Sequence, residues 1–346
     1  MRVHLPLLSL LSLAHSLPHS IPTWQTLAPI PIASRQEHTT LFLPPSTIAI
    51  LGGVVPDNTS NLIPPFANTP LMQFYSMSTN TWTSRAPLPV PMNHINAATA
   101  NGKIYLLGGL IEYNNDLGRS WRAIPDCWVY DADTDCWTAL PQPLPASEAR
   151  GSAAVGVYDD KIYLAGGVLD LQFYGNATQN SVSVVSVFDI KTETWLDVPE
   201  KAKSIPAPRD HAGAAVVGDK MYVLGGRDHG QGNVRDTVFV LDLCDLDKGW
   251  EVSEARMPTP RGGVAAGVVG TKVYTFGGEG DTSVESGVFD EIEAYDTVND
   301  SWESVGTMNI PRHGTYAVGV EGKVYIPGGA IVQGGGPVTH FDVFVP

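Results

Sequence analysis

Short apolar stretches, rather than long amphipathic ones, recur along the chain. Six of them run directly into a glycine pair, and they read TIAILGG, KIYLLGG, KIYLAGG, KMYVLGG, KVYTFGG and KVYIPGG. These stretches are rich in β-branched and aromatic residues and too short for helices, so they predict strands. Successive glycine pairs lie 56, 58, 59, 52 and 51 residues apart. The spacing predicts an internal repeat of six units.

Each unit contains the pattern of four short antiparallel strands. A second apolar run precedes the one at the glycine pair, and turn residues such as Asn101-Gly102 between the two predict a tight hairpin. Further on, an aromatic residue stands seven positions before a tryptophan, as in Tyr75 and Trp82. The fourth unit stretches this distance to nine, between Leu241 and Trp250.

The sixth unit lacks its last strand, because the tryptophan expected after Phe341 would fall beyond Pro346. At the other end, Trp24 precedes Arg35 by 11 residues, as Trp250 precedes Arg261. We therefore expect a strand near 22–27 to pair with one near 339–345. Such pairing closes a ring of sheets and leaves only short, protected edges.

The glycine pair, the aromatic-Asp dipeptide and the tryptophan seven residues after the aromatic together resemble the kelch repeat. The resemblance implies an all-β fold, a six-bladed kelch β-propeller closed by the N-terminal strand, with 21–346 as a single domain. The tryptophans are then expected to pack between blades and the glycines to permit positive φ. Kelch propellers include enzymes, adaptors and binding scaffolds, so the fold does not decide the function.

Charge and the N-terminus bear on partners and localisation. The chain has 21 basic and 36 acidic residues, a net charge of −15, which argues against nucleic acid or an anionic membrane as partner. Residues 1–16, MRVHLPLLSLLSLAHS, predict a signal peptide, with cleavage placed as late as 20, and no stretch is long enough to span a bilayer. We expect a secreted monomer.

Export makes two modifications relevant. The sequence contains three N-glycosylation tripeptides, at Asn58, Asn176 and Asn299. Cys127 and Cys136 lie in DCWVYDADTDCW, which looks like a strand, a turn and a strand, and this favours a cross-strand disulfide over two unpaired thiols.

A series of arginines supplies the candidate ligand-binding residues. An arginine stands sixteen residues before four of the glycine pairs and seventeen before the first, while Met92 takes this place in the second unit; the arginines are Arg35, Arg150, Arg209, Arg261 and Arg312. The long, variable loops gather at the same end of the units. Guanidinium groups around a central opening would bind a carboxylate, phosphate or sulfate. The alternative is that each pairs with a carboxylate of its own or the neighbouring blade.

Histidines and carboxylates map to the same end. We assign His94 to ligand binding, and His211, His313 and Asp210 to proton transfer, because imidazole beside carboxylate suits general acid–base catalysis near neutral pH. No pair of residues has metal-ligand spacing, and no P-loop, dinucleotide fingerprint or G-x-S-x-G motif is present. We therefore predict no metal and no cofactor.

Three kelch enzyme types offer a comparison. The chain resembles galactose oxidase only in its propeller, since that enzyme has flanking domains and a copper site built from tyrosines, histidines and a crosslinked cysteine. Plant specifier proteins hold iron through Glu-x-x-x-Asp-x-x-x-His, but the nearest match here, Glu193 and Asp197, ends in Lys201. N-acetylneuraminate epimerase is similar in architecture and size.

The leading hypothesis is a secreted binding or recognition propeller with a basic mouth for a small anionic or carbohydrate-like ligand. One alternative is a cofactor-independent enzyme or accessory protein that acts on a small molecule, either as a sugar mutarotase or in an isomerase or cyclase step of secondary-metabolite biosynthesis. A second alternative is a protein-docking scaffold. The sequence leaves open whether there is catalysis.

Overall fold

The computed structural model describes residues 22–57, 65–116, 118–173 and 179–346. The predicted signal peptide and the sequons at Asn58 and Asn176 lie outside these residues. The third sequon asparagine, Asn299, is exposed in the turn between β22 (Glu291–Asp296) and β23 (Ser301–Thr307). Among the described residues, no helix is long and apolar enough to cross a membrane.

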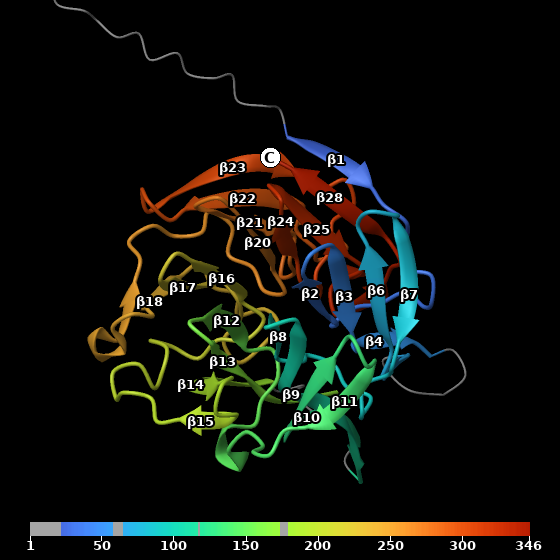
Figure 1. The fold of residues 1–346 in the computed structure, drawn as a ribbon. Helices are drawn as coiled ribbons and strands as arrows, with labels where there is room; N and C mark the ends of the chain where they lie inside the picture. The colour runs from blue at the N-terminus through green and yellow to red at the C-terminus, as the bar shows by residue number, and fades with distance from the viewer. Residues whose placement is uncertain (1–21, 58–64, 117, 174–178) are drawn as a thin grey trace, which may run out of the picture.

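The described chain is almost entirely β-structure, and most strands belong to antiparallel sheets arranged around a common centre (Figure 1). Four separate sheets have four strands each. In spatial order, they are β2 (Thr39–Leu43), β3 (Thr47–Leu51), β6 (Met72–Ser76) and β7 (Thr81–Arg85); β16 (Gly213–Val217), β17 (Lys220–Leu224), β18 (Val238–Asp242) and β19 (Trp250–Val252); β20 (Ala265–Val269), β21 (Lys272–Phe276), β22 and β23; and β24 (Val318–Val320), β25 (Lys323–Pro327), β28 (Phe341–Val345) and β1 (Thr23–Thr26).

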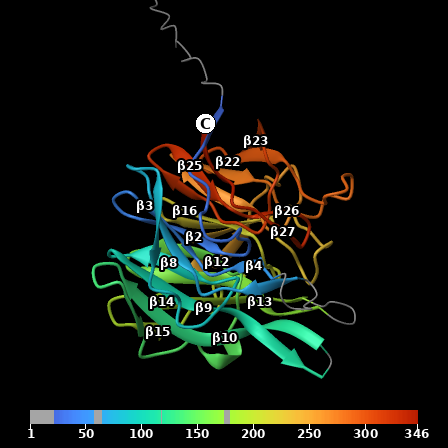
Figure 2. The same ribbon diagram turned by 90° about the vertical axis from the view of Figure 1, so that its right-hand side faces the viewer.

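A fifth sheet has eight strands, in two consecutive groups: β8 (Ala97–Ala100), β9 (Lys103–Asn115), β10 (Gly118–Asp131) and β11 (Cys136–Ala139), then β12 (Ala154–Tyr158), β13 (Lys161–Gln172), β14 (Gln179–Asp189) and β15 (Thr194–Leu196). The two groups join where β10 pairs with β13, with Trp121 opposite Leu171. The β9–β10 hairpin extends past its neighbours (Figure 2). Two short hairpins complete the long-loop side, β4 (Val54–Pro56) with β5 (Phe66–Asn68) and β26 (Ala330–Val332) with β27 (Gly335–Pro337).

The expected pairing between the two ends of the chain is confirmed. Strand β1 pairs antiparallel with β28, with Trp24 opposite Phe344. The Trp24 ring packs against Phe344 and Phe276, at centroid distances of 5.1 and 6.0 Å. One four-stranded sheet is therefore built from both chain ends.

Tryptophans join neighbouring sheets, as the repeat pattern predicts. The Trp82 ring lies 5.4 Å from that of Phe341, and its indole N–H donates to the Ala28 carbonyl at 2.8 Å. Trp137 and Trp250 donate equivalent bonds across to other sheets. Each of these indoles adds apolar burial and one hydrogen bond to an inter-sheet contact.

The predicted disulfide between Cys127 and Cys136 is absent, and the strand register explains why. Cys136 stands opposite Asp131, four residues along β10 from Cys127. At about 3.3 Å per residue this offset is roughly 13 Å, far beyond the Cα separation that a disulfide can bridge. The Cys127 thiol donates instead to the Pro125 carbonyl, and Cys136 is exposed.

Candidate functional site

The five arginines singled out in the sequence do lie at the inner ends of the sheets, but their guanidinium groups turn into the sheets. Each is nearly or fully buried, and each hydrogen-bonds groups close to its own repeat. Arg150, for example, donates to the carbonyl oxygens of Gly166 and Leu164 at 2.6 and 3.0 Å.

Two of the arginines form buried ion pairs. Arg261 contacts Glu293 at 2.9 Å and Arg312 contacts Asp342 at 3.1 Å. For these two residues the contacts match the alternative in which each arginine pairs with a carboxylate of its own or the neighbouring blade. Arg35, Arg150 and Arg209 instead donate to carbonyl, amide or hydroxyl oxygens. An anion site built from the five guanidinium groups is therefore not the arrangement that the structure presents.

The residue two positions after each arginine, or after Met92, has a different placement. Six such residues, one from each repeat, are all buried and all have positive φ; they are Glu37, His94, Ser152, His211, Gly263 and Gly314. Hydrogen bonds link them in a closed circuit. The peptide N–H of each donates to the backbone oxygen of the preceding member, except that His211 N–H uses the Ser152 hydroxyl. We call these six residues the axial ring.

Four members of the axial ring are not glycine, with φ between 50° and 53°. A left-handed backbone costs an L-residue roughly 1–2 kcal/mol, and such outliers concentrate at functional sites. The conformation directs the side chains of Glu37, His94 and His211 together. This observation points to a site at the ring.

The three side chains make close contacts. His94 Nε2 lies 2.7 Å from His211 Nε2 and 3.2 Å from Glu37 Oε2, and His211 Nε2 lies 3.9 Å from that oxygen. Glu37, His94 and His211 are 7%, 2% and 6% exposed. Gly314 leaves room for the carboxylate in this position, since a Cβ there would stand 2.5 Å from Glu37 Oε1 and the carboxylate would have to shift.

The other nitrogen of each imidazole has an oxygen partner. His211 Nδ1 donates to Asp210 Oδ1 at 2.5 Å, and His94 Nδ1 donates to Asn93 Oδ1. The Asn93 amide nitrogen donates to Asn68 Oδ1 at 2.6 Å, which turns the Asn93 oxygen toward the histidine. With both Nδ1 atoms protonated, a neutral imidazole presents an unshared electron pair at Nε2.

A network of buried charges surrounds the ring. Arg227 donates to Asp210 at 3.3 Å and to Glu279, and Glu279 in turn faces His313 Nδ1 at 3.4 Å and accepts the Gly334 N–H at 2.9 Å. The predicted catalytic residues His211 and Asp210 are thus in direct contact. His313 joins them only through Glu279 and Arg227.

The network sets the protonation states of its members. Burial lowers the pKa of His94 well below its ordinary value, and the charges of His211 and Arg227 add to this effect. Burial opposes ionisation of Asp210, but its bonds to His211 and Arg227 lower the pKa to about 2. Burial likewise opposes ionisation of Glu279, and His313 and Arg227 nevertheless bring its pKa below the usual value.

A cavity of about 150 Å³ opens on the long-loop side of the axial ring. We call it the axial pocket. Its floor contains Glu37, His94 and His211, and aromatic rings line its wall; the aromatic residues are Phe66, Trp121 and Phe173. Trp121 lies 4.8 Å from Phe173 and 5.7 Å from Phe66 between ring centroids, and 5.4 Å from His94. The wall comes from β5, β10 and the end of β13.

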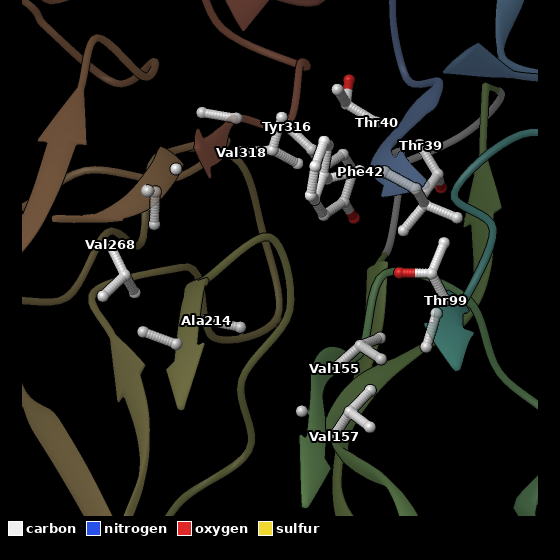
Figure 3. A pocket seen from close by; sticks show the side chains of 18 of the residues that line it. Thr39, Thr40, Phe42, Thr99, Val155, Val157, Ala214, Val268, Tyr316 and Val318 are labelled. Atoms are coloured by element: carbon white, nitrogen blue, oxygen red, sulfur yellow. The ribbon is translucent and has the colours of Figure 1, made fainter. Parts of the chain in front are cut away.

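A second cavity, of about 440 Å³, lies among the innermost strands on the other side of the ring. Small apolar side chains make up most of its wall. Val155, Ala214 and Val318 face a common space that the Tyr316 ring enters (Figure 3). We call it the channel pocket. It is larger than the axial pocket, but no charged side chain lines it in the described part of the chain.

Sequence reasoning found part of this site. It selected His94, His211 and Asp210, which meet at the axial ring, and missed Glu37 and Arg227. The missed signal is the position two residues after the repeat arginine, because Glu37 stands there as His211 does. The aromatic wall had no comparable signal, since its members lie in the stretches after the glycine pairs, which vary from repeat to repeat.

A family model describes this sequence pattern. Residues 18–226 match the KLHDC2/KLHL20/DRC7 Kelch-repeats domain, and residues 173–329 match it again. The chain is similar to "Structure of YjhT", a solved structure, with a TM-score of 0.70 and 19% sequence identity over 91% of this chain and 95% of the other. At that identity the likeness concerns the fold alone.

Curated relatives extend the comparison. "Kelch-like protein terF" of Aspergillus terreus is 39% identical over 330 residues, 93% of this chain and 68% of the relative. Kelch domain-containing protein 3 of Bos taurus is 28% identical, over 70% of this chain and 64% of its own. "N-(sulfonatooxy)prop-2-enimidothioate sulfolyase" of Thlaspi arvense is 32% identical over 42% of each chain. The chain spans about two thirds or less of the length of these relatives.

Proposed function

Because the chain belongs to the kelch-repeat family, we propose that it is a binding protein for a small organic molecule, which it holds in the axial pocket. The observation that carries this proposal is the convergence of an aromatic wall on a polar floor of one carboxylate and two imidazoles. Pockets with apolar walls and a few convergent polar groups are typical of small-molecule sites. The channel pocket is larger, but it offers few groups that would fix a ligand's orientation.

The lining favours a neutral ligand over an anionic one. Glu37 and Glu279 place carboxylates at the pocket, and its guanidinium, Arg227, is already bonded to Asp210 and Glu279. Of the two ligand classes that the sequence suggested, anionic and carbohydrate-like, we therefore retain the carbohydrate-like one. A molecule with a flat apolar face and hydroxyl or carbonyl groups suits the Trp121 ring and the imidazoles. At about 150 Å³ the cavity accepts a single ring.

A pair of variants tests this proposal. Trp121→Ala removes the centre of the aromatic wall, whereas Val157→Phe adds bulk to the wall of the channel pocket. Binding of neutral monosaccharides, phenols and carboxylated sugars is measured for both variants and the wild type by calorimetry. We expect a neutral ring compound to bind, Trp121→Ala to weaken it about tenfold or more, and Val157→Phe to leave it unchanged. The reverse pattern, or selective binding of the anions, would overturn the proposal.

Catalysis is the second candidate function, favoured by the contact of His211 with Asp210. A carboxylate on Nδ1 holds the imidazole in one tautomer, and Nε2, which lies 2.7 Å from His94 Nε2 at the floor of the pocket, is then the proton acceptor. One relative, matched over 42% of each chain, bears the name "N-(sulfonatooxy)prop-2-enimidothioate sulfolyase". Exchange between sugar anomers, followed by NMR, tests a mutarotase step. Turnover that survives His211→Ala would refute this role.

We also propose six blades in a closed ring. The eight-stranded sheet divides into two four-stranded groups, which makes six with the four separate sheets. Their first strands touch in cyclic order, β2, β8, β12, β16, β20, β24 and β2 again. Secretion after cleavage within 16–20 and glycosylation at the three sequons remain part of the proposal. The mass of the mature protein before and after glycosidase treatment tests both.

A further inference from the structure

We propose that Glu37, His94 and His211 bind a divalent transition-metal ion at the floor of the axial pocket. This inference deepens the proposed function, because the ion would face the organic ligand of the same pocket. The three side chains come from three different repeats and meet only in the folded chain.

The separations of the donor atoms fit one ion. Zinc lies about 2.0–2.2 Å from imidazole nitrogen and carboxylate oxygen, so two ligand atoms on one ion are at most roughly 4.4 Å apart. The three separations here are 2.7, 3.2 and 3.9 Å. All three separations fall within that limit.

The surroundings of the two imidazoles are those of metal ligands. Metal-bound histidines almost always donate their second N–H to a carboxylate or carbonyl, which fixes the tautomer. Asp210 and Asn93 accept these bonds from His211 and His94. The two Nε2 atoms consequently face each other at 2.7 Å, a separation that requires either a shared proton or a metal ion between them.

Charge balance also favours a divalent cation. Glu37, Asp210 and Glu279 are three buried carboxylates, and Arg227 is the guanidinium that faces them. With neutral imidazoles the group has a net charge of −2, which is costly to bury uncompensated. One divalent ion would neutralise this charge.

The donor set indicates the class of ion. Two imidazoles and one carboxylate suit zinc, iron, cobalt, nickel or manganese rather than calcium or magnesium, which prefer oxygen ligands. Three protein ligands leave further positions of the ion free. Those positions would be available to water or to a hydroxyl or carbonyl group of a molecule in the axial pocket.

Titration with metal alone tests the inference. The full chain, with any affinity tag removed and treated with a chelator, is titrated with Zn²⁺ by calorimetry and with Co²⁺ by visible absorption. The variants are His94→Ala, His211→Ala and Glu37→Gln. The matched control is His229→Ala, because the His229 side chain is half exposed and bonds Asp228 rather than a member of the axial ring.

We expect one equivalent of metal per chain for the wild type and the control, and binding weakened about hundredfold or more in each ring variant. Cobalt should give a visible d–d spectrum in the wild type and the His229→Ala control, and this spectrum should be lost or changed in the three ring variants. Zn²⁺ should raise the melting temperature of the wild type but not of Glu37→Gln. This variant keeps the shape of the side chain, so the test does not depend on whether the alanine variants fold. If the wild type binds no stoichiometric metal, or if Glu37→Gln binds it equally well, the inference is overturned. A proton shared by the two Nε2 atoms would then lie between the imidazoles.

The outcome is separable from that of the proposed function, because no organic ligand is used. Ligand binding without metal binding refutes only the metal site. If the protein binds metal but no organic ligand, only the proposed ligand-binding function is refuted.

Discussion

Replacing Arg261 by methionine separates a structural arginine from a ligand-binding one. Arg261 is fully buried, and its guanidinium donates to Glu293 at 2.9 Å, to the Glu291 carbonyl at 2.7 Å and to the Thr275 hydroxyl at 3.0 Å. Methionine fills much of the volume without the charge. The Glu293 carboxylate, 2% exposed, then keeps a 2.6 Å bond from Thr259 but loses its counter-charge.

The magnitude follows from the burial of both partners. Removing one member of a buried ion pair typically costs about 3–5 kcal/mol, because the remaining charge is left in a medium of low dielectric constant. With an unfolding entropy of ~2.1 cal/mol/K per residue, 346 residues correspond to roughly 0.7 kcal/mol per degree. The melting temperature should therefore fall by roughly 4–7 °C.

Urea unfolding followed by tryptophan fluorescence measures the free energy of unfolding. The double variant Arg261→Met with Glu293→Leu is the control, since replacing both charges by apolar groups is often neutral or stabilising. We expect it to recover most of the stability lost in the single variant. A single variant as stable as the wild type that nevertheless loses ligand binding would refute a structural role for Arg261.

Three further predictions concern the scaffold. Gly277→Ala should lower the free energy of unfolding in urea by several kcal/mol, because φ is 55° and a Cβ would stand 2.0 Å from a backbone oxygen. Gly218→Ala, where φ is 61° and the space is open, should lower it by only about 1 kcal/mol, and equal losses would contradict the close approach. Iodoacetamide at pH 8 should modify Cys136 and spare Cys127 until the protein unfolds, since burial raises the pKa of the Cys127 thiol to about 12 and keeps the thiol protonated at lower pH. If mass spectrometry finds neither thiol free after unfolding without reductant, the two cysteines form a disulfide instead. Trp24→Ala should lower the free energy of unfolding by about 2 kcal/mol, and unchanged stability would show that the pairing of the chain ends contributes little.

Local patterns alone were enough to predict the sheets. Strand length, turn residues and the recurring glycine pair are short-range features that occur in every repeat unit. A strand that is hard to assign in one unit can therefore be placed from the same position in the others. The pairing of β1 with β28 could be predicted for the same reason. The sixth unit was missing a tryptophan that Trp24 supplies.

The cysteines show where local patterns end. Both lie on the expected hairpin, but the disulfide required a register that the turn does not allow, and Cys136 faces Asp131 instead. Which strand residues stand opposite each other is set by the length of the turn and the register of pairing, which composition does not reveal.

The sequence by itself determined the repeat, the all-β class and the end of the sheets at which the candidate site residues gather. Only the tertiary structure decided which of them meet. The arginines turn into the sheets because a buried guanidinium needs several acceptors, and the carbonyls and carboxylates there supply them. Glu37, His94 and His211 meet because repeats far apart in the chain converge at the axial ring, and this proximity has no counterpart in residue spacing.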